Sequence, residues 1–103
     1  MKLATVRRHA LSLHAVTEEP HHDHASFRVR GRIFVTVPPS ADAIHVFVEE
    51  ADRELAVAMY PDWAESLMWG GKAKGVRIAL ATAPAAAVKS LVAKAYESRA
   101  GKR

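Results

Sequence analysis

Residues 67–80 decide the fold more than any other stretch, and they read Leu67-Met68-Trp69-Gly70-Gly71-Lys72-Ala73-Lys74-Gly75-Val76-Arg77-Ile78-Ala79-Leu80. The adjacent glycines, Gly70 and Gly71, permit a left-handed backbone without steric cost, so they predict a tight turn. Beyond the turn, apolar residues alternate with others as in a strand that has one buried face: Val76, Ile78 and Leu80 against Arg77 and Ala79. The stretch predicts a basic strand–turn–strand unit, and it specifies no reaction.

Three more strands are expected before this unit. Residues 27–30 alternate apolar and arginine side chains, Gly31-Arg32 provides a tight turn, and residues 33–37 return as the second strand. Residues 43–48 predict a third strand, with His45 and Phe47 on the face opposite its aliphatic residues. Residues 16–24 are polar and contain Pro20, so we expect a loop there.

Helices are expected at both ends and in the middle of the chain. Thr5 is a candidate cap for a first helix that runs to about Leu13. Carboxylates at residues 49–52 suit the first turn of a second helix, which should end by Tyr60, and residues 62–66 should form a turn of helix or a loop. The last helix starts at Pro84 and has an apolar stripe at helical spacing: Val88, Leu91, Val92, Ala95 and Tyr96.

The order of these elements, α-β-β-β-α-β-β-α, predicts the fold class. It favours an α+β domain of two layers, in which an antiparallel sheet of about five strands carries its helices on one face. No connecting helix separates the first three strands, so parallel crossovers between them are not expected. We expect one domain over residues 1–103, with a basic tail from about residue 99.

Composition limits the classes of function. The chain has no cysteine, which excludes disulfides and thiolate chemistry, and no run near the ~18 apolar residues that cross a bilayer. We therefore expect a soluble, cytoplasmic protein without membrane contact. The net charge of +4 is segregated: +3 over residues 1–37, −6 over 38–66 and +7 over 67–103. Either the basic ends attract a polyanion, or the acidic middle neutralises basic neighbours within the fold or across a dimer contact.

Three segments resemble a known family. Residues 24–34, His-Ala-Ser-Phe-Arg-Val-Arg-Gly-Arg-Ile-Phe, resemble the strand–turn–strand signature of the MmcQ/YjbR-like proteins. Residues 46–48 before the acidic helix, and Trp69-Gly70-Gly71-Lys72 before Gly75-Val76-Arg77-Ile78, are similar to later motifs of that family. The resemblance implies a YjbR-like, secretion-chaperone-like fold. Members often carry a DNA-binding label, and no catalytic residue set comes with the family. This chain departs at His14-Ala15, where relatives often show Pro-Gly.

Other candidate sites carry weaker signals. Residues 20–24, Pro-His-His-Asp-His, contain metal-ligand side chains, but their spacing fits neither a helix face nor a zinc-finger pair, so a solvated loop is favoured. Gly70-Gly71-Lys72 lacks the spacing and the hydroxyl of a phosphate loop. The serines lack a nucleophile-elbow context. We expect no enzyme activity, no cofactor and no small-molecule substrate.

The face of the sheet away from the helices is the leading candidate surface. Guanidinium groups interleaved with aromatic rings there are typical of a surface that grips phosphates and stacks on unpaired bases. The same residue types are enriched in dimer and protein interfaces, so the alternative is a protein-interaction or chaperone-like module that self-associates through this face. Long arginine side chains also cover plain solvated sheets. The hypothesis requires the arginines to project together from this face. Its candidate residues are Arg28, Arg30, Arg32, Phe47, Trp69, Lys72, Lys74 and Arg77.

Overall fold

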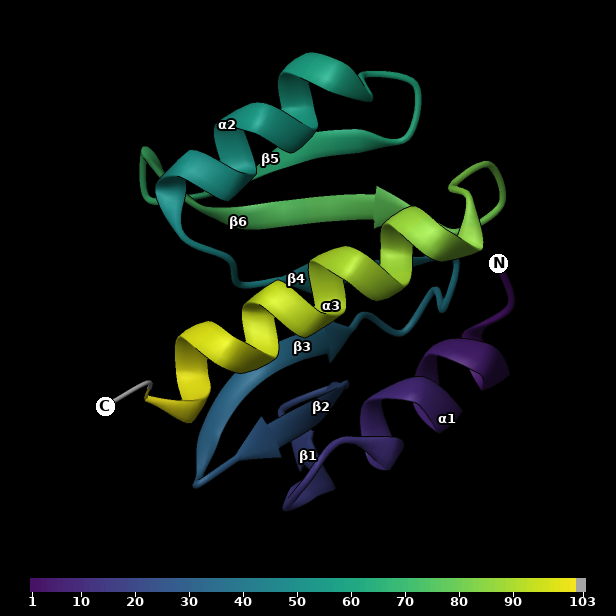
Figure 1. The fold of residues 1–103 in the computed structure, drawn as a ribbon, viewed down its shortest axis with the longest axis vertical. Helices are drawn as coiled ribbons and strands as arrows, with labels where there is room; N and C mark the ends of the chain where they lie inside the picture. Colours follow the sequence, from purple (N-terminus) through teal and green to yellow (C-terminus); the bar gives the residue numbers. More distant parts are fainter. Residues whose placement is uncertain (102–103) are drawn as a thin grey trace.

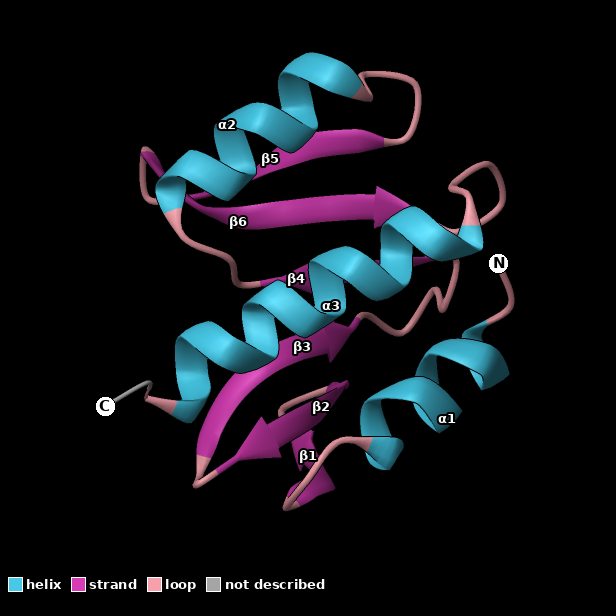
Figure 2. Ribbon diagram, viewed as in Figure 1, coloured by secondary structure: helices cyan, strands magenta, loops and turns pink. Residues whose placement is uncertain are grey.

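The computed structural model of the protein describes residues 1–101 and places six strands and three helices within them. In chain order they are α1 (Leu3–Ser12), β1 (Val16–His21), β2 (His24–Val29), β3 (Arg32–Val37), β4 (Ala43–Val46), α2 (Glu50–Met59), β5 (Ala64–Trp69), β6 (Lys72–Ala79) and α3 (Ala85–Ala100). The strands form one sheet in the order β1-β2-β3-β4-β6-β5, and each neighbouring pair is antiparallel. Figures 1 and 2 show the three helices together on one side of the sheet.

The core lies between the sheet and this helical layer. α3 crosses the middle strands (Figure 1), and its predicted stripe is buried at Val88, Leu91, Val92 and Ala95. The sheet contributes the aliphatic side chains of alternate residues, such as Val46, Val76 and Ile78, all without measurable exposure. Removing such side chains from water is the main stabilising contribution, roughly 1.5–3 kcal/mol for each one fully buried. The predicted fold class, α+β with helices on one face, is confirmed.

The sheet has one strand more than the sequence predicts, because residues 16–21 form β1 and not a loop. β1 pairs along its whole length with β2, from Val16 opposite Val29 to His21 opposite His24. It is an edge strand whose inner residues are all exposed, so no buried face imposes an alternating pattern on its sequence. Pro20 is tolerated because an edge strand has one side without hydrogen-bonding partners.

Smaller differences concern where elements begin and end. α1 starts at Leu3, with Lys2 at the cap position and no side-chain capping bond, so Thr5 does not cap it. The turn between β2 and β3 is formed by Arg30 and Gly31, both with positive φ, and not by Gly31 and Arg32. β5 already begins at Ala64, within the stretch expected to be a turn.

Two further backbone positions differ from expectation or from the family pattern. α3 continues to Ala100, so Arg99 belongs to the helix and not to a basic tail, while residues 102–103 of that tail lie outside the described part. Ala15, where relatives often have glycine, adopts φ of 64°. The turn after α1 therefore keeps a left-handed residue although alanine is disfavoured in that conformation.

Candidate functional site

A lateral row of polar side chains crosses the open face of the sheet, the face without helices. The strand register aligns Ser26 with Thr36, Thr36 with His45, His45 with Arg77, and Arg77 with Glu65. We call these five residues the polar row. Ser26, Thr36 and His45 are buried although they belong to the helix-free face. Neighbouring side chains therefore cover the centre of this face, and it is not uniformly exposed to solvent.

Hydrogen bonds in the polar row fix the tautomer of His45. Arg77 Nη1 lies 3.2 Å from His45 Nε2, and Thr36 Oγ1 lies 3.3 Å from His45 Nδ1. Because a guanidinium only donates, Nε2 must accept, so the ring proton is on Nδ1 and is donated to Thr36. Burial, with the nearby Arg77 guanidinium and His24 as further causes, lowers the pKa of His45 to about 4. His45 is therefore neutral at pH 7.

The two arginines of the open face are already engaged by neighbouring groups. Arg77 lies between His45 and Glu65, with Nε 3.6 Å from the Glu65 carboxylate. Arg28 Nε donates to Ser26 Oγ at 3.0 Å, and its Nη2 donates to the Pro20 carbonyl at 3.1 Å. Both guanidiniums therefore hold strands together. Binding a phosphate there would require these contacts to be given up or shared.

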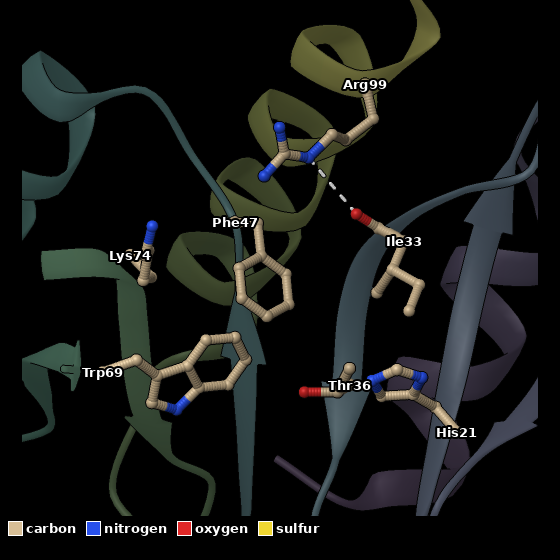
Figure 3. A pocket seen from close by; sticks show the side chains of 7 residues that line it. All are labelled: His21, Ile33, Thr36, Phe47, Trp69, Lys74 and Arg99. Carbon is tan, nitrogen blue, oxygen red and sulfur yellow. Dashed lines mark hydrogen bonds between the residues drawn. The ribbon is translucent and has the colours of Figure 1, made fainter. Parts of the chain in front are cut away.

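A pocket of about 300 Å³ opens on the same face, beside the polar row. We call it the aromatic pocket, and Figure 3 shows the side chains that line it: His21, Ile33, Thr36, Phe47, Trp69, Lys74 and Arg99. Phe47 lies at its centre, with Trp69 and Lys74 on one side and Ile33 and Thr36 on the other (Figure 3). The pocket thus combines an aromatic wall with two side chains that carry positive charge.

The backbone around Phe47 explains how the pocket forms. β4 ends at Val46, but the Phe47 amide still donates to the Phe34 carbonyl at 3.1 Å, which holds its ring on the open face. On the other side, Gly75 lets β6 pass close to β4, since a Cβ there would lie only 2.3 Å from the Val46 carbonyl oxygen. Phe47 is buried, with 7% of its surface exposed, yet it lies outside the main core cluster.

Arg99 reaches the pocket from the last turn of α3. Its Nε donates to the Ile33 carbonyl at 3.2 Å (Figure 3), and its guanidinium carbon lies 5.9 Å from the centre of the Phe47 ring. The second contact has the geometry of a cation–π interaction. Arg99 therefore closes one end of the pocket with a positive charge that remains partly accessible.

Trp69 supplies the accessible aromatic surface. Its ring centre lies 5.7 Å from that of Phe47 at an angle of 51°, and 49% of its surface is exposed. In contrast, Trp63 is buried and stacks on Tyr60 with centres 4.8 Å apart. An indole half open to solvent beside a buried ring is suited to stacking against a planar ligand.

Charge around the pocket is of one sign. Its lining includes Lys74 and Arg99 and no carboxylate. Much of the acidic middle segment lies on the helical side instead, where Asp52 is 3.9 Å from Lys94 and Glu49 accepts a hydrogen bond from Ser98. The acidic helix therefore neutralises part of α3 within the fold, and the pocket retains its positive character.

The structure gathers only some of the predicted candidate residues. Phe47, Trp69 and Lys74 line the pocket, and Lys72 is opposite Trp69 in the β5–β6 register. Arg28 and Arg77 lie on the open face but contact other side chains. Arg30 is in the β2–β3 turn, and Arg32 approaches Gly101 at the end of α3. Arg28 and Arg77 therefore share the open face as expected, whereas Arg30 and Arg32 do not project with them.

Four pocket residues were not among the candidates from the sequence: His21, Ile33, Thr36 and Arg99. Arg99 follows Val92 and Ala95 at helical spacing, so its position on the inner side of α3 was readable, but its contact with Ile33 spans 66 positions. His21 was assigned to a loop because β1 was not recognised. Figure 3 shows its ring beside Thr36.

The histidine-rich segment forms the turn of the β1–β2 hairpin. His21 and His24 end and begin the paired strands, and His24 Nδ1 lies 2.8 Å from the Asp23 carboxylate. Within residues 1–101, no three histidine, aspartate or glutamate side chains are arranged so as to hold a metal ion. The same described range contains no helix with the length and apolar character needed to span a membrane.

Comparisons with known proteins place the fold. The YjbR family model matches residues 11–98. The crystal structure of Deinococcus radiodurans protein DR2400, described as a DUF419 domain, is similar with a TM-score of 0.83 and 18% sequence identity. The match covers 98% of this chain and 80% of that one. At this identity the likeness shows the fold alone. No curated protein matches the sequence.

Proposed function

The chain belongs to the YjbR family, and from that premise we propose that it binds single-stranded nucleic acid at the aromatic pocket. The single observation that carries the proposal is the half-exposed Trp69 indole, which lies against Phe47 in a pocket that Lys74 and Arg99 also line. One unpaired base would stack on Trp69, and the flanking phosphates would contact the two cations.

Physical chemistry favours this ligand over a duplex. Bases in a duplex are stacked on each other, so their faces are not open to a tryptophan, whereas an unpaired base offers one. Stacking on an aromatic side chain contributes about 1–3 kcal/mol per base, and it tolerates any base. The candidate contacts are therefore Trp69, Phe47, Lys74, Lys72 and Arg99, with Arg28, Arg30, Arg32 and Arg77 outside the principal site. The lack of cysteine fits the cytoplasmic location that we propose.

Fluorescence polarisation with labelled oligonucleotides tests the proposal. We expect single strands to bind more tightly than duplexes of the same sequence, and log affinity to fall linearly as log salt rises, because phosphate neutralisation releases counterions. Trp69→Ala should weaken single-strand binding by about 1–3 kcal/mol, which is roughly fivefold to 150-fold. Trp69 is half exposed, so the variant should stay folded.

Met68→Ala is the matched control, since Met68 precedes Trp69 in β5 and is also about half exposed, but it does not line the pocket. Its affinity should stay within about twofold of the unaltered chain. Equal losses in both variants, or affinity that does not change with salt, would contradict the proposed site.

A further inference from the structure

The helical side of the molecule has a hollow of its own, between α2 and α3. It measures about 260 Å³ and is lined mostly by apolar side chains, including Leu55 and Met59 of α2, Tyr60 at the cap that follows α2, and Ala87 and Leu91 of α3. This hollow lies on the opposite side of the sheet from the aromatic pocket, because the helices cover only one face (Figure 1). The nucleic-acid proposal therefore leaves it unexplained.

Two large apolar side chains stand at the rim of the hollow and face solvent. Leu55 is 58% exposed and Met59 is 56% exposed, and their i, i+4 spacing places them together on one side of α2. The neighbouring surface of α3 is built from small residues, with Ala85, Ala86 and Ser90 all exposed. Small side chains let another helix approach closely. The protruding Leu55 and Met59 of α2 therefore lie next to a surface of α3 that another helix can pack against.

The two helices also differ in charge. α2 has three acidic residues, Glu50, Asp52 and Glu54, against one basic residue, for a net charge of −2. α3 has three basic residues, Lys89, Lys94 and Arg99, against one acidic residue, for a net charge of +2. Within one copy only Asp52 and Lys94 come within 4.0 Å of each other between these helices, at 3.9 Å. Glu54 is exposed and lies 3.8 Å from Arg53 of its own helix, and Lys89 of α3 is exposed as well.

We propose that this face joins two copies of the chain about a two-fold axis, with α2 of each copy against α3 of the other. A two-fold interface uses the same patch twice, so that patch must be complementary to itself. This patch meets the condition, because Leu55 and Met59 of one copy enter the hollow of the second, and acidic α2 meets basic α3. A second copy is thus the occupant that both shape and charge specify. The two aromatic pockets would then face outwards.

Sedimentation velocity over about 5 to 200 µM protein tests the proposal, in a range that detects weak self-association. The unaltered chain should shift with concentration from 11.3 kDa towards a species of twice that mass. A double variant, Leu55→Glu with Met59→Glu, should remain at 11.3 kDa throughout. Both side chains are more than half exposed, so circular dichroism and thermal unfolding should show that the variant is still folded.

Leu11→Glu is the matched control, because Leu11 is an apolar side chain of α1 that is 42% exposed and lies outside the hollow. It should leave the dimer unchanged. Self-association that survives the Leu55/Met59 double change would place the interface elsewhere and overturn the proposal. A chain that stays monomeric at every concentration would also overturn it, and would leave the hollow to a helix of another protein. Neither result depends on whether nucleic acid binds.

Discussion

The polar row and the aromatic pocket are neighbours on one face of one sheet, but they use their charged groups differently. In the polar row, Arg77 is held between His45 and Glu65, and the central residues are buried. In the pocket, Trp69 is half exposed, and Lys74 has no hydrogen bond or ion pair to any residue within 1–101. The other cation of the pocket, Arg99, makes one hydrogen bond within the same range, from Nε to the Ile33 carbonyl. The row is therefore internally satisfied, and the pocket only in part.

This difference shows why a count of basic residues does not locate a binding site. Arg28 and Arg77 were as prominent in the sequence as Lys74, yet both cross-link strands. A group whose hydrogen bonds are already made in the free protein gains little by binding a ligand. The residues to test are accessible cations that keep donors without an internal partner: Lys74, and Arg99, whose one hydrogen bond within the described residues uses only Nε.

The largest effect should come from Gly75, which lies on β6 between the two regions. A Cβ at this position would meet the Val46 carbonyl oxygen at 2.3 Å, so Gly75→Val must separate β4 from β6. We expect the free energy of unfolding to fall by at least about 3 kcal/mol, with loss of both the polar row and the pocket. Denaturant unfolding measures it. Valine normally favours strands, so a neutral or stabilising result would show that the close approach is wrong.

Gly71→Asn provides the comparison, at a glycine in the turn that joins β5 to β6. Gly71 has φ of 80°, and nothing lies within 4 Å of an added Cβ. Asparagine tolerates this left-handed conformation better than most residues, so the expected loss is below about 1 kcal/mol.

The second prediction concerns the pH dependence of the polar row. His45 has a pKa of about 4 in the folded protein against an ordinary value of 6.5, so the unfolded chain binds a proton more readily between these values. The contribution of neutral His45 to the free energy of unfolding is therefore complete above pH 6.5 and is lost as the pH falls towards 4. We expect His45 to lower the free energy of unfolding by roughly 2–3 kcal/mol over this pH range. Urea unfolding at a series of pH values measures the loss.

His45→Gln isolates this contribution, since glutamine fills a similar volume and does not titrate. Other groups titrate in the same range in both proteins, so the informative quantity is the difference between their pH profiles. If the free energies of unfolding of the unaltered chain and of His45→Gln fall in parallel from pH 7 to 4, the pKa of His45 is not lowered by burial. Nucleic-acid affinity near pH 7 should be almost the same in both.

The third prediction separates two arginines by their surroundings. Arg99→Gln removes the positive charge over Phe47, and we expect single-strand affinity to fall about fivefold to tenfold, on the order of 1 kcal/mol. Arg28→Gln removes a charge of the same sign that is bonded to Ser26 and Pro20, and the loss should be below about twofold. Polarisation titrations at one salt concentration give both values. If Arg28→Gln weakened binding more than Arg99→Gln, the binding site would lie at the polar row and not at the aromatic pocket.

The smallest effect is expected at Lys72, opposite Trp69 at the end of the hairpin. It is exposed, so Lys72→Ala should leave stability unchanged within about 0.5 kcal/mol. If Lys72 neutralises one phosphate, the slope of log affinity against log salt should become less steep by about 0.7 for a single strand. A slope that does not change would remove Lys72 from the contact surface while leaving the stacking contact in place.

Much of the fold was predictable because burial imposes periodicity on sequence. The α3 stripe from Val88 to Ala95 and the alternation of Val76 and Ile78 are both buried as expected. β1 was not predictable in this way, because an edge strand exposed on both sides obeys no such constraint. Its charged residues and Pro20 protect an edge against further pairing, and they also disguise the strand.

The site was predictable only in part. Alternation along β4 assigned Phe47 to the open face, and the glycine turn placed Trp69 near Lys72. The contact of Arg99 with Ile33 joins segments 66 positions apart, for which one sequence contains no signal. The partners of Arg28, Ser26 and Pro20, lie within the β1–β2 hairpin, which was not recognised because β1 was not. The hydrogen-bonding state of each cation, which separates the polar row from the aromatic pocket, was therefore visible only in three dimensions.

Tryptophan fluorescence tests the central claim most directly, because it reports on the stacking group itself. In a Trp63→Phe background the emission comes from Trp69 alone, and phenylalanine preserves the buried stack on Tyr60. The account predicts that a single-stranded oligonucleotide quenches this emission at low salt, in step with binding measured by polarisation. Emission that stays constant while the oligonucleotide binds would contradict it.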